Sequence, residues 1–336
     1  MRFCFAGFGH VHIYSLLEAV QTREDLTFAG ACEGNPDLAQ KARRRGVEIL
    51  YTSLTDALND TDADVVAIGA PFGLRGALAI EALNAGKHVI ADKPLCTSLE
   101  ELAEIEAIAR DRDLRVGCML TMRDSPEMVN LRAHLARGCV GEVQAIQFGG
   151  QHPLNATTRP SWYFEPGMHG GTITDIFIHA ADFLPWVTGL EWSSCLSARC
   201  WNATCPDIPH FRDGAQMMLT MANGCGVLGD VSYFMPSEGA YGLPYYWRTT
   251  LFCSGGILEI ADGDRSLTVT KNGNVIPLDR IVARGGGYLE GFLKDIRGEV
   301  DGDDLTTADV IDAMRVTLTV QGAADTSRRD VSLVAS

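Results

Sequence analysis

The chain has 336 residues, of which 46% are hydrophobic and 21% are charged, close to ordinary globular usage. This composition excludes an intrinsically disordered chain, and the length suggests about two domains. The formal net charge of −15 repels polyanions, so we expect no nucleic-acid partner.

The N-terminal part of the chain alternates strand-like and helix-like segments. Apolar runs predict strands at Phe3–Ala6, Phe28–Cys32, Val65–Ile68, His88–Ala91 and Arg115–Cys118. Between them, helices are predicted at Gly76–Ala85 and Leu99–Arg110, and Ser98 is a candidate N-cap for the latter. Strands and helices in alternation imply parallel pairing with right-handed crossovers, and therefore a doubly wound sheet.

After about residue 120 the pattern changes to helices followed by consecutive strands. Helices are predicted at Ser125–Arg137, Thr172–Val187, Tyr288–Gly298 and Thr306–Ala324. Strands are predicted at Ala215–Met221, Cys225–Ser232, Thr249–Cys253, Ile257–Ala261 and Leu267–Thr270. The segments Ala222–Gly224 and Lys271–Asn274 are typical of hairpin turns, so this part predicts an antiparallel meander.

A glycine-rich turn, Gly7-Phe8-Gly9-His10-Val11, directly follows the first strand and opens a helix. Glycines at these positions allow a tight turn and close approach of backbone to a diphosphate, and the helix N-terminus favours that anion. His12 stands where the third glycine of the usual pattern would be. Glu33 ends the second strand, where a carboxylate meets the adenosine ribose and repels a 2′-phosphate, which favours NAD over NADP. The alternative is an ordinary turn with a solvated Glu33.

Two further groups of residues suggest chemistry. Asp92-Lys93-Pro94 follows a buried strand, and ligands meet an open α/β sheet at the carboxyl ends of its strands. Asp175 and His179 lie four residues apart on a predicted helix, so the imidazole could accept a proton beside a carboxylate. Each has a simpler explanation: a lysine that extends to the rim of the sheet, and an Asp–His pair that only stabilises its helix.

In combination, these motifs resemble the Gfo/Idh/MocA oxidoreductase family. The shared order is the glycine-rich turn, Ala70-Pro71, the Lys93-Pro94 pair and the helix that carries Asp175 and His179. The resemblance implies an α/β fold with an N-terminal Rossmann domain over 1–120 and a C-terminal α+β domain over 121–336, whose large, mainly antiparallel open sheet forms homodimers or homotetramers. The last helices can pack back on the first domain.

The resemblance also implies roles for individual residues. Lys93, Asp175 and His179 would form the catalytic set, with His179 as the base and Lys93 holding the reacting oxygen. Residues expected to bind the cofactor are Gly7, Phe8, Gly9, His10, Val11, Glu33, Ala70, Pro71, Arg75, Asp92 and Lys93. The chain departs from the family pattern at His12, at Arg75 where histidine is common, and at Asp92 where glutamate is usual.

The expected substrate is a sugar, a cyclitol or a related polyol, because an aromatic and polar segment precedes the Asp175 helix. Expected substrate-binding residues are Arg123, His152, Trp162, Tyr163 and His169, and Arg159 is a further candidate. Alternatively, Arg123 forms a salt bridge between domains, and the two aromatic residues belong to the core. The activity expected is NAD-dependent hydride transfer. An enzyme that retains NAD for transient oxidation and a non-catalytic nucleotide-binding regulator stay open as alternatives.

The start of the chain and the cysteines bear on the cellular compartment. The sequence begins with an apolar run at Arg2–Ala6, without a charged leader, and no apolar run has the roughly 18 residues of a membrane span. We therefore expect a cytoplasmic protein with no membrane partner and ten reduced cysteines. Cys195, Cys200 and Cys205 lack the close spacing of a structural zinc site, so we expect no metal.

Overall fold

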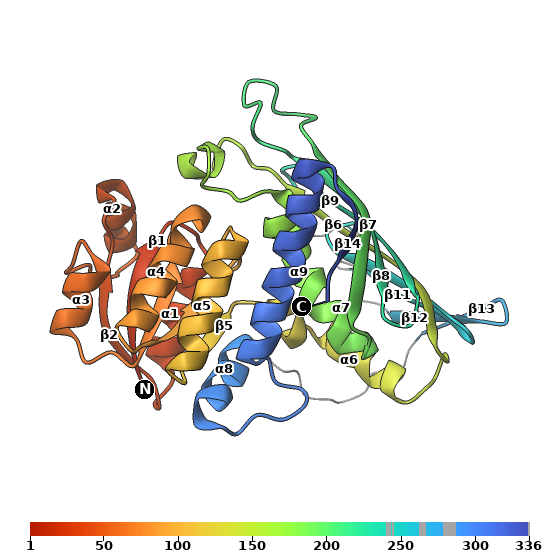
Figure 1. The fold of residues 1–336 in the computed structure, drawn as a ribbon, viewed down its shortest axis with the longest axis horizontal. Coiled ribbons are helices and arrows are strands. Elements are labelled where there is room, and N and C mark those ends of the chain that lie inside the picture. The colour runs from red at the N-terminus through yellow and green to blue at the C-terminus, as the bar shows by residue number, and fades with distance from the viewer. Residues whose placement is uncertain (240–242, 244, 262–266, 278–286, 335–336) are drawn as a thin grey trace. The chain divides into compact units, whose positions relative to one another are not determined.

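The computed structural model describes residues 1–239, 243, 245–261, 267–277 and 287–334. The chain divides into two compact units (Figure 1). The first comprises Met1–Met119, Pro160–Gly170 and Tyr288–Met314, and the second comprises Leu120–Arg159, Gly171–Gly287 and Arg315–Ser336. The sequence predicted two domains that meet at residue 120, with the last helices able to pack back on the first. In the structure, Tyr288–Met314 and the unexpected segment Pro160–Gly170 belong to the first unit.

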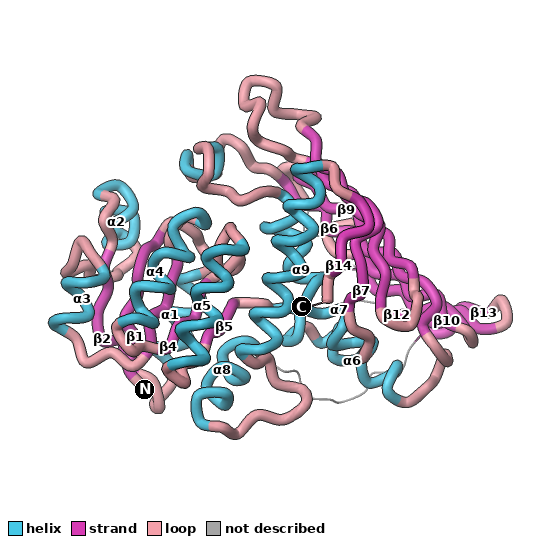
Figure 2. The backbone as a smooth tube through the Cα atoms, viewed as in Figure 1, coloured by secondary structure: helices cyan, strands magenta, loops and turns pink. Residues whose placement is uncertain are grey.

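The first unit is built on a five-stranded parallel sheet (Figure 2). Its strands are β1 (Arg2–Phe8), β2 (Thr27–Cys32), β3 (Val65–Gly69), β4 (His88–Ala91) and β5 (Val116–Cys118), in the order β2-β1-β3-β4-β5. A single parallel bridge joins Cys32 of β2 to Tyr51 beyond it. If this bridge is counted as a short strand, the order is 3-2-1-4-5-6, which is the order of dinucleotide-binding sheets. The prediction of a doubly wound sheet is confirmed.

Five helices connect these strands: α1 (Ile13–Thr22), α2 (Pro36–Arg44), α3 (Leu54–Asp60), α4 (Phe72–Asn84) and α5 (Leu99–Asp111). The side chain of Ser98 accepts a hydrogen bond from the Glu101 N–H, so the predicted cap of α5 is confirmed. Helix α4 starts earlier than the predicted Gly76. Its first turn contains Gly73, where a Cβ would lie 2.2 Å from the Gly167 oxygen, so this close approach needs a glycine.

The segment after residue 287 belongs to the first unit because α8 (Tyr288–Arg297) packs against its sheet. Phe292 is buried in the same apolar core as Phe3 and Ile90, and burial of such a side chain contributes about 1.5–3 kcal/mol. Its ring lies where a side chain on Gly117 would be, since a Cβ there would come within 2.8 Å of the ring. Glycine on β5 therefore makes room for α8.

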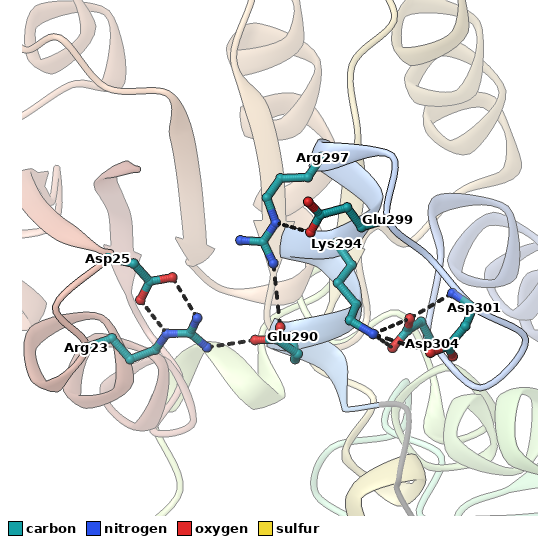
Figure 3. A network of polar contacts seen from close by, with 8 residues as sticks. All are labelled: Arg23, Asp25, Glu290, Lys294, Arg297, Glu299, Asp301 and Asp304. Carbon is teal, nitrogen blue, oxygen red and sulfur yellow. Dashed lines mark hydrogen bonds and ion pairs between the residues drawn. The ribbon is translucent and has the colours of Figure 1, made fainter.

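Ion pairs surround α8 on its polar side (Figure 3). Arg23 bridges Asp25, at 2.7 Å, and Glu290, at 2.9 Å, and so links α8 to the loop after α1. Lys294 pairs with Asp304 at 3.0 Å and ties α8 to the loop that follows it. The Arg23 pairs are partly exposed, so each adds little stability and mainly fixes the position of the segment.

The second unit contains a nine-stranded sheet in the order β13-β12-β11-β10-β6-β9-β8-β7-β14. Its strands are β6 (Val143–Pro153), β7 (Trp192–Trp201), β8 (Gly214–Met221), β9 (Gly226–Met235), β10 (Arg248–Cys253), β11 (Gly256–Ala261), β12 (Leu267–Lys271), β13 (Asn274–Pro277) and β14 (Arg329–Ser332). Neighbouring strands are antiparallel except β6 and β9. The predicted large, mainly antiparallel sheet is confirmed, although β6, β7, β13 and β14 were not predicted as strands.

Helices of the second part of the chain are α6 (Pro126–Ala136), α7 (Ile178–Thr188) and α9 (Thr307–Thr326). The two predicted hairpin turns are present, with Gly224 at φ 83° between β8 and β9 and Gly273 at φ 82° between β12 and β13. Within the described ranges, we find no helix long and apolar enough to cross a membrane. No disulfide joins any of the ten cysteines, all of which lie in the described part of the chain.

Candidate functional site

The glycine-rich turn after β1 fits closely against the end of β3. Gly7 has φ 81°, and a Cβ on it would lie 2.7 Å from the Cα of Ala70. A Cβ on Gly9 would lie 2.7 Å from the Cδ of Pro71. The turn can therefore approach the Ala70-Pro71 segment only because both residues are glycine.

Glu33, at the end of β2, holds this turn by hydrogen bonds to backbone N–H groups. One carboxylate oxygen accepts a hydrogen bond from the Phe8 N–H at 2.8 Å, and the other accepts from the Asn35 N–H at 2.8 Å. Trp162 adds a third connection, because its indole N–H donates to the Gly9 oxygen at 3.0 Å. The turn is thus held in place by side chains from distant segments of the first unit.

A cavity of about 600 Å³ opens beside the turn within the first unit. Gly7, Glu33, Ala70 and Pro71 are among the residues that line it. Glycines that admit close backbone approach, a carboxylate at the end of the second strand and a cavity between them fit the adenosine part of a dinucleotide. The sequence-predicted residues on this side of the site are therefore brought together.

Asp92 lies at the centre of a buried polar cluster. His10 Nδ1 lies 2.5 Å and Arg75 NH2 3.2 Å from one carboxylate oxygen, and His12 Nδ1 lies 3.2 Å from the other. Burial alone would raise the pKa of Asp92, but His10 and Arg75, together with the hydrogen bonds, hold it well below its ordinary value. Burial lowers the pKa of His10, and Asp92 opposes that shift. Asp92 is therefore an ionised carboxylate inside the protein.

Arg75 fixes the backbone around Lys93. Its guanidinium is fully buried and donates to the carbonyl oxygens of Ala70, at 2.8 Å, of Asp92, at 2.7 Å, and of Pro94, at 3.1 Å. The residues on both sides of Lys93 are thus held by one arginine, which sets where the lysine leaves the backbone. Arg75 therefore binds backbone carbonyl oxygens just after β3 and β4. Its expected contact with the cofactor stays a prediction.

The second unit presents Asp175 and His179 on a helix that begins irregularly. Residues Ile173–Phe177 form a π-helical turn before α7, so the prediction of a regular α-helix from Thr172 is wrong for the first turn. Gln321 accepts hydrogen bonds from the Ile173 and Thr174 N–H groups at 3.1 and 3.3 Å and so caps this end. Short π-helical segments occur frequently at functional sites.

Aromatic and polar side chains of the same unit surround this helix start. The hydroxyl of Tyr233 on β9 donates a hydrogen bond to the carboxylate of buried Asp175. The ring of His179 lies 5.4 Å from that of Trp247, and the ring of His152 lies 5.1 Å from the same indole. The structure therefore brings two residues that the sequence singled out, His179 and His152, to the same indole, and it pairs a third, Asp175, with Tyr233.

The two predicted arginines of the second unit have different surroundings. Two guanidinium nitrogens of Arg123 donate to one carboxylate oxygen of Asp182, at 3.0 and 2.7 Å, and one of them also lies 3.3 Å from the other oxygen. Both side chains are buried. This ion pair lies within the second unit, and the expected role of Arg123 in substrate binding stays a prediction. Arg159 lies with its guanidinium carbon 5.9 Å from the centre of the Tyr233 ring, near Asp175. Arg159 is therefore the better placed of the two to meet a ligand.

Trp162, Tyr163 and His169 belong to the first unit. Their rings pack around Phe72, the first residue of α4, with centroid distances of 5.0, 5.8 and 5.8 Å. Trp162 and Tyr163 are buried, and Trp162 also lines the 600 Å³ cavity. These contacts place them beside the glycine-rich turn, and their expected role in substrate binding stays a prediction.

Sequence reasoning missed Tyr233, Trp247 and Gln321, and treated His12 only as a departure from the glycine pattern. Tyr233 and Trp247 lie in or beside strands, where an aromatic residue is ordinary, so no local signal marks them. Gln321 lies on α9, far along the chain from the helix that it caps. The histidine spacing in the glycine-rich turn was a usable signal, since both imidazoles face one carboxylate.

Comparison with known proteins supports this picture. Residues 1–119 match the model of an oxidoreductase family with an NAD-binding Rossmann fold, named GFO_IDH_MocA, and residues 128–259 match the C-terminal domain of the same family. Levoglucosan dehydrogenase of Pseudarthrobacter phenanthrenivorans is 29% identical over 59% of this chain and 51% of its own length. 1,5-Anhydro-D-fructose reductase of Ensifer adhaerens is 30% identical over 44% of this chain and 45% of its own. The chain thus matches about half the length of these curated relatives.

Solved structures share the fold over nearly the whole chain. A structure from Thermotoga maritima aligns with a TM-score of 0.84 at 22% identity, over 98% of this chain and all of the other (100%). An aldose-aldose oxidoreductase from Caulobacter crescentus aligns with a TM-score of 0.78 at 15% identity, over 98% and 99% of the two chains. At these identities the likeness concerns the fold.

Proposed function

Because the chain belongs to the Gfo/Idh/MocA oxidoreductase family, we propose that it is an NAD-dependent dehydrogenase of a sugar, cyclitol or related polyol. The observation that carries the proposal is the buried pair of Asp175 and His179 at a π-helical turn, with the hydroxyl of Tyr233 on the carboxylate. A buried imidazole four residues along the helix from a buried carboxylate, with an indole 5.4 Å from the imidazole, suits a substrate that carries hydroxyl groups.

Each of these residues has one role in the proposed hydride transfer. His179 accepts the proton of the substrate hydroxyl as the C–H bond breaks. Asp175 accepts a hydrogen bond from a substrate hydroxyl, and Tyr233 keeps its carboxylate turned toward that position. Lys93 stabilises the negative charge that develops on the reacting oxygen. Bound NAD supplies the hydride acceptor.

The substrate class rests on the mixture of rings and polar groups around His179. Trp247 and His152 provide flat faces for C–H groups of a sugar ring, and Arg159 provides hydrogen-bond donors. Relatives with the names levoglucosan dehydrogenase and D-xylose dehydrogenase point to the same class.

Incubation of the purified chain with NAD and a panel of aldoses, anhydrosugars and inositols tests this function. We expect NADH to form, measured by its absorbance, with at least one member of the panel. The absorbance of the protein as purified shows whether the cofactor is retained. Tight NAD binding without turnover of any polyol would contradict a dehydrogenase and favour a regulator, and a retained cofactor that cycles without net NADH would favour transient oxidation.

We further propose that the chain uses NAD in preference to NADP because of Glu33. A buried carboxylate at the rim of the cavity accepts hydrogen bonds from ribose hydroxyls and repels a 2′-phosphate. The substitution Glu33→Ala is expected to weaken NAD binding by about tenfold and to narrow the difference between NAD and NADP, because it removes one charge and a bond to the turn. Titration of both cofactors against both proteins measures this, and an unchanged preference would contradict the assignment.

A homodimer or homotetramer that forms through the large sheet is also proposed. One face of this sheet exposes Met218, Leu228 and Val275, with exposures of 49, 50 and 68%, around a concavity of about 1090 Å³. Exposed apolar surface of this kind is typical of protein interfaces. Sedimentation analysis of the purified chain tests the proposal, and a monomer at micromolar concentration would contradict it.

A cytoplasmic location is proposed from the state of the cysteines. Burial raises the pKa of Cys4 to about 11 and that of Cys32 to about 12, so these thiols stay protonated and unreactive at neutral pH. Thiols that form no disulfide suit a reducing compartment. Fractionation of cells that express the chain tests the location.

A further inference from the structure

The carboxylate of Asp92 is fixed relative to the parallel sheet. Its N–H donates to the Ile68 oxygen at 2.9 Å, its carbonyl oxygen accepts from Arg75 at 2.7 Å, and its side chain has no exposed surface. A short side chain on such a held backbone has little freedom to move. Asp92 therefore offers two oxygens at defined positions just beyond the end of β4.

The histidine of the glycine-rich turn and the histidine just after it contact both oxygens of Asp92. His10 and His12 approach different oxygens of Asp92, each with Nδ1, and their rings meet edge to face at 4.4 Å. His12 stands at the N-terminus of α1, whose first turn has no acidic residue, and its side chain is 48% exposed. One end of that imidazole is thus anchored to a buried anion, while the rest of the ring is partly exposed at a helix N-terminus, a position that favours anions.

We propose that His10, His12 and Asp92 act as one positioning unit that holds the glycine-rich turn in the shape that accepts the diphosphate of the dinucleotide. The inference rests on the proposed use of NAD and adds a further anchor to the turn, beside those formed by Glu33 and Trp162. A turn held in its binding shape loses less conformational freedom when the ligand arrives, and so binds more tightly.

The two imidazoles limit how long the side chain at position 92 can be. A glutamate would carry its carboxylate about 1.5 Å farther, into the space that the two imidazoles occupy. Removal of the His12 ring would open part of that space. The substitutions Asp92→Glu and His12→Ala should therefore compensate each other, although each alone disturbs the turn.

The same three side chains have a spacing that could hold a metal ion. Arg75 weighs against this, because its guanidinium lies 3.2 Å from the carboxylate and already neutralises it. EDTA distinguishes the two possibilities. It should leave NAD binding unchanged if the three side chains form a hydrogen-bonded unit, and it should weaken NAD binding if they hold a metal ion.

The test measures the dissociation constant for NAD, with no need for turnover, in the full-length protein and its variants His12→Ala, Asp92→Glu and the double substitution. We expect about fivefold weaker binding for H12A, about twentyfold weaker binding for D92E, and recovery of at least fivefold in the double variant relative to D92E. Gln21→Ala, at an exposed position of α1 away from the cluster, is the matched control and should bind NAD as the unaltered chain does.

Several results would overturn the proposal. These are independent, multiplicative effects of the two substitutions, normal binding by H12A, or loss of NAD binding when the unaltered chain is treated with EDTA. If D92E alone does not fold, melting temperatures decide: a double variant that folds supports the proposal, and one that does not fold overturns it. A chain that binds NAD but oxidises no polyol contradicts only the proposed function, whereas a chain that does not bind NAD contradicts both.

Discussion

Substitution of Lys93 by methionine should lower turnover of the best substrate in the panel by roughly 10³-fold, and His179→Asn should do the same, with NAD binding changed by less than about threefold. Methionine keeps the length and apolar stem of the lysine but cannot stabilise negative charge on the reacting oxygen. Asparagine keeps a polar group but cannot take the proton. Both side chains are nearly buried, so each acts from a defined position. Rates of NADH formation and NAD titrations measure the two quantities.

Matched controls separate loss of chemistry from general damage. Lys87→Met alters a lysine just before β4, at the other end of the strand from Lys93, and His210→Asn alters an exposed histidine of the second unit. Both controls should turn over substrate at the normal rate. Near-normal turnover in K93M or H179N would remove the residue concerned from the catalytic set, and loss of NAD binding in either would indicate damage to the cofactor site instead.

The nucleotide-binding half could be predicted because its signals are local. A glycine-rich turn needs residues that tolerate close approach, and Gly7 and Gly9 meet Ala70 and Pro71 as that requirement implies. Glu33 could also be predicted from its position, because the second strand of such a sheet ends beside the glycine-rich turn and Glu33 directly follows β2. In parallel sheets, buried strands are continuous apolar runs, so their positions could be read directly.

The second unit was harder to predict because its sheet is partly polar. Strand β7 carries serine and arginine at positions where a core strand would carry apolar residues, and only every third side chain at its start is buried. Strand β6 does alternate, with Ile146 and Phe148 buried, but its glycines weaken the pattern. The π-helical turn at Asp175 depends on a cap from Gln321, and no local pattern reports such a distant partner.

The role of Arg123 can be decided by stability, because its ion pair with Asp182 is the feature that separates a structural arginine from a ligand-binding one. Both side chains are buried, with exposures of 5 and 1%, and Arg123 donates hydrogen bonds at 3.0 and 2.7 Å to one carboxylate oxygen of Asp182. Removal of one partner leaves the other charge buried and uncompensated, which costs about 3–5 kcal/mol. Arg123→Met is therefore expected to lower the free energy of unfolding by about that amount, measured by urea denaturation.

A compensating pair of substitutions sharpens this prediction. In the double variant Arg123→Met with Asp182→Leu, no buried charge is left, so most of the lost stability should return, because apolar residues of similar volume can replace a buried ion pair at little cost. Arg137→Met, at the exposed end of α6, is the matched control and should change the free energy of unfolding by less than about 0.5 kcal/mol. The opposite result is that R123M unfolds at the same urea concentration as the unaltered chain and raises only the KM for the polyol. In that case the arginine binds substrate, and its ion pair with Asp182 contributes little to stability.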